Sequence, residues 1–303
     1  MTPRRLAVSL AAALACLATG AATANATSLP VEYNGVTGYA HTSPTASPPG
    51  ANNWSCRPSR AHPRPVVLVH GTFLDMANDW QALAPLLANS GYCVFALNYG
   101  PSNGSGALGI DATGPIAVSA EELSAFVGKV LAATGASRVD IVGHSQGGMM
   151  PRYYLRFLGG AAKVGTLVGL APSNHGTTVN GLFTLGSLIP GADSFAGLCQ
   201  ACEEQASSSP FLAKLNAGSE TVGKVRYTVI ESANDEVVTP YTSAFLSGKH
   251  VTNVLLQSQC PLDQGEHLSM PYDYIADADV LTALDPKHPV SPACTLVLPV
   301  VGG

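Results

Sequence analysis

Apolar stretches and amphipathic stretches alternate along most of this chain. Short, nearly continuous runs of Val, Ile and Leu predict buried strands, and apolar residues at helical spacing predict helices. The predicted strands are 65–71, 92–99, 138–145, 164–172, 224–232 and 250–258, and the predicted helices are 79–91, 119–135 and the segment that starts at Gln146. Buried strands that alternate with helices predict an α/β fold: a mostly parallel central sheet flanked by helices.

The same pattern divides the chain into segments. Residues 27–64 are rich in Ser, Thr, Pro, Gly and Asn and predict an irregular N-terminal arm. Residues 65–303 form one predicted domain with no internal linker. Within it, residues 176–223 interrupt the alternation and predict a lid-like or cap-like insertion. In the helix 119–135, Ser119 is the expected N-cap, and Glu122 completes a capping box.

The first 26 residues have the layout of a secretory signal peptide. Arg4 and Arg5 precede the apolar run "LAVSLAAALACLATGAA", and "ANA" at 24–26 offers a cleavage site. An uncleaved membrane anchor is less favoured because the run is alanine-rich and ends in a cleavage pattern. Cys16 does not complete a lipoprotein box, since Ala13 stands where a leucine is needed. We therefore predict a secreted, extracellular protein.

Composition narrows the classes of partner. Hydrophobic residues make up 46% of the chain and charged residues only 12%, against about 25% in a typical protein. Cleavage after residue 26 removes two arginines and no acids, so the formal net charge changes from −5 to −7. This charge gives no basis for nucleic-acid binding. Low charge suits contact with a lipid–water interface, and a monomer is expected.

Six cysteines follow the leader segment: Cys56, Cys93, Cys199, Cys202, Cys260 and Cys294. An even number in a secreted protein predicts disulfides, and six cysteines allow 15 pairings. Cys199 and Cys202 form a C-x-x-C pair, for which a local structural bridge is expected. No second C-x-x-C and no paired histidines complete a zinc site, so no metal is predicted.

A glycine-flanked serine marks the expected reactive centre. "VDIVGHSQGG" places Ser145 between Gly143 and Gly147, at the point where a predicted strand turns into a helix. This G-x-S-x-G turn, a nucleophile elbow, exposes the serine hydroxyl at the carboxyl end of the strand. The alternative is a glycine-rich turn that serves packing alone.

A serine needs a base and an orienting acid to become a nucleophile. In such folds the acid and then the histidine follow the serine along the chain. Asp235 follows the strand 224–232, and His267 follows the strand 250–258. The rival acids are Glu236 and Asp263, and the other downstream histidines are His175, His250 and His288.

The negative oxygen of a tetrahedral intermediate needs hydrogen-bond donors. The backbone amide of Gln146 is one candidate because it opens the helix after the serine. The second is expected in "LVHGTFLD", at Thr72, whose hydroxyl can supply a third donor; Phe73 is the fallback. His70 precedes the serine, so its expected role is to hold this loop.

These motifs resemble those of a known family. "GHSQGG", "HGT", "APSNHGT", "SANDEVVTP" and "NVLLQSQC…EH" resemble segments of the secreted triacylglycerol lipases of the α/β-hydrolase type, the bacterial class 2 group, and are similar to the yeast lipase B type. The resemblance supports the triad Ser145, Asp235 and His267 and the oxyanion hole Thr72 and Gln146. It implies the disulfides Cys56–Cys93 and Cys260–Cys294, whereas Cys199–Cys202 rests on proximity alone. His144 stands where lipase B has tryptophan, so substrate preferences do not transfer.

The expected activity is hydrolysis of a carboxylic ester through an acyl-enzyme, with no cofactor. The insertion carries Leu182, Phe183, Leu185, Leu188 and Ile189, which form either an apolar rim for an acyl chain or ordinary core. Three alternatives stay open: a polyesterase, an acyltransferase, and a catalytically silent binding protein of the same fold.

Overall fold

A six-stranded, entirely parallel sheet organises the chain. The computed structural model describes residues 28–40, 43–101, 106, 109–188 and 198–303. The strands follow the order β2-β1-β3-β4-β5-β6. They comprise β1 (Val66–Val69), β2 (Val94–Leu97), β3 (Val139–His144), β4 (Val164–Leu170), β5 (Arg226–Glu231) and β6 (Val251–Leu255). The predicted α/β architecture with a parallel sheet is confirmed.

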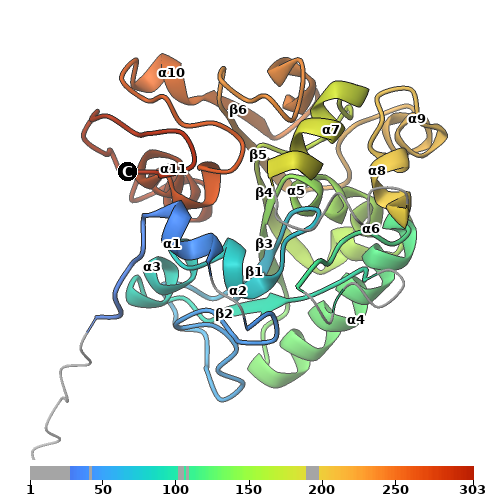
Figure 1. The fold of residues 1–303 in the computed structure, drawn as a ribbon. Helices are drawn as coiled ribbons and strands as arrows, with labels where there is room; N and C mark the ends of the chain where they lie inside the picture. The colour runs from blue at the N-terminus through green and yellow to red at the C-terminus, as the bar shows by residue number, and fades with distance from the viewer. Residues whose placement is uncertain (1–27, 41–42, 102–105, 107–108, 189–197) are drawn as a thin grey trace, which may run out of the picture.

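Helices cover both faces of this sheet (Figure 1). On one face lie α3 (Leu83–Asn89) and α11 (Tyr274–Leu284), and on the other lie α4 (Ile116–Thr134) and α6 (Pro151–Phe157). Successive strand residues point to opposite faces. Val66 and Leu68 accordingly pack into the core under α3 and α11, and Val67 and Val69 pack into the core under α4 and α6. Burial on both faces explains why the strands read as continuous apolar runs.

Two predicted helices are interrupted. The segment 79–91 contains the last residue of α2 (Met76–Asp79) and then α3, with the fully buried Trp80 between the two helices. The helix after Ser145 consists of α5 (Gln146–Met149) and α6, because Pro151 begins a new helix in place of continuing the old one. The strand predicted to reach residue 258 ends at Leu255, where α10 (Leu256–Gln259) follows.

The capping box predicted for 119–135 is wrong. Helix α4 begins at Ile116, so Ser119 is an interior residue whose hydroxyl donates to Pro115 O. Glu122 instead accepts the Gly100 N–H at 2.8 Å. The carboxylate of Glu204, 88 positions further along the chain, accepts the Ile116 N–H at 2.7 Å. A carboxylate distant in the sequence therefore caps the start of α4, in place of the local capping box that the sequence predicts.

The predicted insertion mostly joins the body of the domain. It contains α7 (Val179–Leu188), α8 (Gln200–Glu204) and α9 (Pro210–Asn216). Ala201 of α8 and Leu212 and Leu215 of α9 lie in the same core as α4 and α6. A lid role for residues 176–223 stays a prediction, and Ile189 lies outside the described residues.

Disulfides join Cys56 to Cys93, Cys199 to Cys202 and Cys260 to Cys294. The first joins the arm, whose described part contains α1 (Gly35–Tyr39), to the residue directly before β2. The last fixes the C-terminal tail to the segment after α10. Within the part of the chain that the structure describes, no helix has the length and apolarity to cross a membrane.

Candidate active site

The turn at Ser145 has the strained geometry expected of a nucleophile elbow. Ser145 follows β3 directly and has φ 55° and ψ −122°, a backbone conformation that non-glycine residues rarely adopt. A Cβ added at Gly143 would lie 1.8 Å from Gly147 O, and one added at Gly147 would lie 2.0 Å from Val69 O. Only glycine fits on either side of the serine, which explains the G-x-S-x-G spacing.

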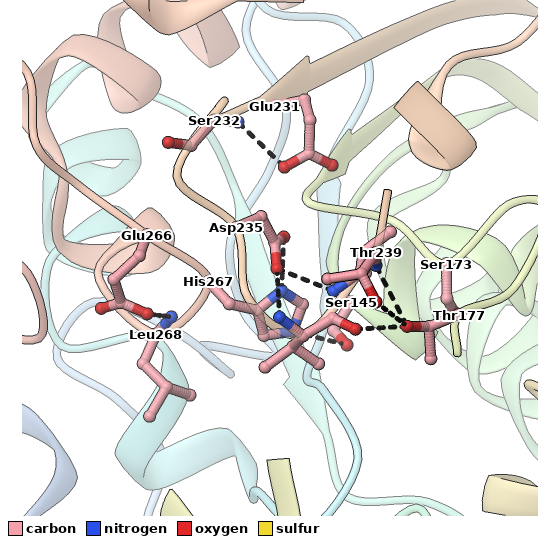
Figure 2. Close-up of polar contacts among 12 residues, drawn as sticks. Ser145, Ser173, Thr177, Glu231, Ser232, Asp235, Thr239, Glu266, His267 and Leu268 are labelled. Atoms are coloured by element: carbon pink, nitrogen blue, oxygen red, sulfur yellow. Dashed lines mark hydrogen bonds and ion pairs between the residues drawn. The ribbon is translucent and has the colours of Figure 1, made fainter. Parts of the chain in front are cut away.

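The structure brings Ser145, His267 and Asp235 together (Figure 2). His267 Nε2 lies 3.0 Å from Ser145 Oγ, and His267 Nδ1 lies 2.8 Å from Asp235 Oδ2. The other oxygen of Asp235 accepts the N–H groups of Val237 and Val238, both at 2.7 Å. Ser145 is 2% exposed and His267 is fully buried. Low exposure strengthens the charge–dipole interactions within this chain of hydrogen bonds.

The rival residues lie elsewhere. Burial, followed by the neighbouring Glu266 carboxylate, raises the pKa of Glu236 to about 8, so this side chain is mostly neutral at pH 7. Asp263 accepts the Gly265 N–H and shares a side-chain hydrogen bond with Asp273. Among the histidines, His175 bonds Glu220 and His288 bonds Asp285, while His250 is exposed before the amino end of β6.

Thr72 lies beside the start of α5, in contact with Gln146. Its Oγ1 accepts Gln146 Nε2 at 2.8 Å and Gln205 Nε2 at 2.9 Å. A hydroxyl has two acceptor lone pairs and one O–H donor. With both lone pairs used, the Thr72 O–H remains to donate. Gln205, on the insertion, is a contact that sequence reasoning missed.

Two backbone N–H groups near Ser145 are free. Among the described residues, the N–H groups of Thr72 and Gln146 have no acceptor in the protein. The Phe73 N–H, by contrast, donates to Asp111 O at 3.0 Å. The fallback donor is therefore occupied, and the geometry favours the Thr72 and Gln146 pair for an oxyanion.

His70 anchors the loop that carries Thr72. Its Nδ1 lies 2.9 Å from Gly71 O, and its ring stacks on Tyr99, whose hydroxyl donates to His70 O. Burial lowers the pKa of His70 to about 4, so the ring is neutral at pH 7. The ring makes no hydrogen bond to the Ser145–His267–Asp235 chain, in keeping with a supporting role.

Sequence reasoning also missed the buried acids around the triad. Glu231 lies near Asp235 and accepts the Ser232 N–H at 2.9 Å (Figure 2). Burial and the Asp235 charge raise the pKa of Glu231 well above its ordinary range. Its place at the end of β5, four residues before Asp235, is the one sequence signal for it. In the described residues, no group of three His, Cys, Asp or Glu side chains is arranged to hold a metal ion.

Two buried acids beside the loop that carries His267, Asp263 and Asp273, predict an unusual pH dependence of stability. Burial, followed by the Asp263 charge, raises the pKa of Asp273 from 3.8 to about 8. The folded protein keeps this proton up to about pH 8, whereas the unfolded chain loses it near pH 4. Stability from this group is therefore present at low pH and is lost as pH rises, by about 1.4 kcal/mol per pH unit within that window. We expect the unfolding free energy of Asp273→Asn to fall less steeply with rising pH than that of the wild type, by about 1.4 kcal/mol per pH unit. Urea titrations at several pH values between 5 and 8 measure this slope. An unchanged slope would contradict the assignment.

The parallel sheet, its two helical layers and the elbow after β3 are those of an α/β-hydrolase. Residues 63–276 match the model of the family described as Lipase (class 2). The match covers more than half of the chain, so this chain belongs to the class 2 lipase family.

Individual relatives are similar over shorter stretches. Triacylglycerol lipases of Pseudarthrobacter phenanthrenivorans and Burkholderia plantarii are each 39% identical over 101 residues, which is 29% of this chain and 27% and 24% of those proteins. The chain thus matches about a quarter of the length of these relatives. The crystal structure of Aspergillus fumigatus lipase B has a TM-score of 0.63 at 22% identity, over 84% of this chain and 61% of that one. At this identity, the likeness supports the fold alone.

Proposed function

We propose that this protein is a secreted serine hydrolase of carboxylic esters, with triacylglycerols as its main substrate class. One observation carries the proposal: an unbroken chain of hydrogen bonds from Ser145 Oγ through His267 to Asp235, at the elbow after β3 (Figure 2). The curated relatives support the substrate class, since both are named triacylglycerol lipases.

The proposed reaction uses only groups of this chain and water. His267 takes the Ser145 proton as Oγ attacks the ester carbonyl, and Asp235 holds the imidazole and stabilises its positive form. The N–H groups of Thr72 and Gln146, with the Thr72 hydroxyl, donate to the oxyanion. His267 then protonates the leaving alcohol. Water activated by the same histidine releases the acid from the acyl-enzyme.

The three disulfides support export, because disulfides persist in oxidising compartments. The leader segment 1–26 lies outside the described residues. N-terminal sequencing of protein from the culture medium tests the proposal: we expect a chain that starts at Thr27. Retention of the intact leader in the cell would contradict it.

A fluorophosphonate probe tests the reactive serine directly. We expect stoichiometric labelling at Ser145, located by mass spectrometry of the digested protein. Hydrolysis of p-nitrophenyl esters from two to sixteen carbons, of a triglyceride emulsion and of a polyester film then defines the substrate. Activity on acetate alone would remove the lipase assignment and leave an esterase, and a preference for the film would favour a polyesterase. A folded protein that resists the probe would support the silent binding protein.

Helix α7 offers an apolar contact for a lipid surface. Its Gly181 lies against Val237 O, in the loop that carries Asp235, and its Leu185 is buried in the core. Phe183, by contrast, is 80% exposed. If α7 meets the lipid–water interface, the Phe183 ring enters the lipid and gains on the order of 1 kcal/mol.

We therefore expect Phe183→Ser to lower activity on a triglyceride emulsion about fivefold while activity on a soluble short-chain ester stays within twofold. Val118→Ser is the control, because Val118 is an exposed apolar residue on α4. Equal losses on both substrates would indicate damage to the site and contradict an interfacial role.

A further inference from the structure

A second histidine–aspartate pair lies directly beside the triad. His144, the residue before the nucleophile, and Asp79, at the end of α2, are both fully buried. His144 Nδ1 lies 3.0 Å from Asp79 Oδ1, and its Nε2 lies 3.0 Å from the backbone carbonyl oxygen of His267. His144 is also the residue at which this chain departs from the tryptophan of the lipase B pattern. Neither side chain takes part in the proposed reaction.

The two contacts of His144 define its protonation. A carbonyl oxygen only accepts hydrogen bonds, so Nε2 carries a proton. Nδ1 faces a carboxylate that already accepts the Gly71 N–H at 3.0 Å, so Nδ1 donates as well. An imidazole that donates from both nitrogens is an imidazolium. Burial alone lowers the pKa of His144, but the Asp79 charge and the hydrogen bonds to Asp79 and His267 O outweigh it and raise the pKa.

This pair touches three separate parts of the proposed machinery. Through Gly71 it holds the loop that presents Thr72, and through the His267 carbonyl it holds the backbone of the base. His144 itself belongs to the elbow. We propose that Asp79 and His144 are positioning residues. As a buried carboxylate–imidazolium pair, they fix the loop that carries Thr72 and the loop that carries His267 around Ser145. The proposal rests on the proposed function of the triad.

Asp79→Asn tests it with little change of shape, since an amide oxygen can still accept the Gly71 N–H. Misplacement of reacting groups by about 1 Å lowers turnover up to a hundredfold. We expect kcat on a soluble p-nitrophenyl ester to fall roughly 10- to 100-fold with KM within about twofold. The rate constant of Ser145 labelling by a fluorophosphonate falls in parallel.

The pH profile separates positioning from general damage. The rings of His144 and His267 lie 5.0 Å apart between centroids. Loss of the imidazolium charge removes a cation near His267 and favours protonation of the base. The acidic limb of the kcat/KM profile therefore moves to higher pH in Asp79→Asn and in His144→Phe. The double variant loses no more activity than the worse single variant, because both changes break one unit.

A second pair in the same chain is a matched control. His175 Nδ1 lies 2.9 Å from Ser243 O, and its Nε2 lies 2.8 Å from Glu220 Oε1. This imidazole also bridges a carbonyl and a carboxylate, but it contacts no member of the triad. We expect Glu220→Gln and His175→Phe to leave kcat and the acidic limb unchanged. A folded Asp79→Asn that behaves like Glu220→Gln would overturn the proposal.

Two measurements keep the test independent of folding and of substrate. In the wild-type protein with ¹⁵N-labelled histidine, NMR reports whether both ring nitrogens of His144 carry protons at pH 8; a single ring proton would overturn the ion pair. If the wild type hydrolyses no ester yet reacts with the fluorophosphonate, the proposed function fails, while the labelling rates of the variants still decide the positioning role.

Discussion

Ester turnover falls by roughly 10⁴- to 10⁶-fold when Ser145 is replaced by alanine, the range expected when a triad loses its nucleophile. The Ser145 hydroxyl is the group that bonds the acyl carbon, and its one side-chain hydrogen-bond partner among the described residues is His267. The backbone at φ 55° already accommodates a Cβ, so alanine adds no steric conflict. The measurement is kcat/KM on the best p-nitrophenyl ester, together with mass spectrometry after fluorophosphonate treatment.

Ser243→Ala is the control for this change, since the Ser243 hydroxyl donates to Gly176 O away from the triad. We expect both variants to keep the wild-type circular dichroism spectrum, and only Ser145→Ala to lose labelling. Labelling of Ser145→Ala at another serine, with activity retained, would show that the nucleophile lies elsewhere.

Asp235→Asn has the second largest expected effect, a loss of about 10⁴ in kcat. The asparagine amide can still accept the N–H groups of Val237 and Val238 at one oxygen, so the loop keeps its shape. Its NH₂ group then faces His267 Nδ1 and favours the tautomer with the proton on Nε2, which cannot accept the Ser145 proton. Single-turnover kinetics isolate this acylation step.

Glu236→Gln provides the comparison for Asp235→Asn. Because Glu236 is mostly neutral at pH 7 and shares a side-chain hydrogen bond with Glu266, we expect its amide variant to keep turnover within a few-fold. If Glu236→Gln proves the more damaging of the two changes at pH 7, the acid has been assigned to the wrong residue.

Much of the fold and the triad candidates follow from the sequence, because both depend on short-range patterns and chain order. The apolar runs at β1 and β3 identify the strands, since a strand buried on both faces tolerates few polar residues. The elbow glycines mark Ser145 by steric necessity. Asp235 and His267 then follow from the chain order of serine, acid and histidine, because they come after the predicted strands 224–232 and 250–258.

The features that sequence reasoning missed depend on contacts between distant residues. The start of α4 was misplaced because Glu204 supplies the acceptor at Ile116 N from 88 positions away, and no local pattern encodes that bond. The pairing of Asp79 with His144 spans 65 positions, and the contact of Gln205 with Thr72 spans 133. Such contacts exist only once the chain has folded, so they are absent from any periodicity or motif.

Two long-range hydrogen bonds, made by Glu204 at the end of α8 and by the following Gln205, bear on protein engineering. Exchange of residues 176–223 for the corresponding segment of a relative would test the acyl-chain rim that the sequence predicts in this insertion. In this chain the exchange also removes the acceptor at the start of α4 and one of the two donors to the Thr72 hydroxyl. A chimaera that keeps Glu204 and Gln205 separates altered selectivity from collateral loss of rate, whereas one that discards them changes both at once.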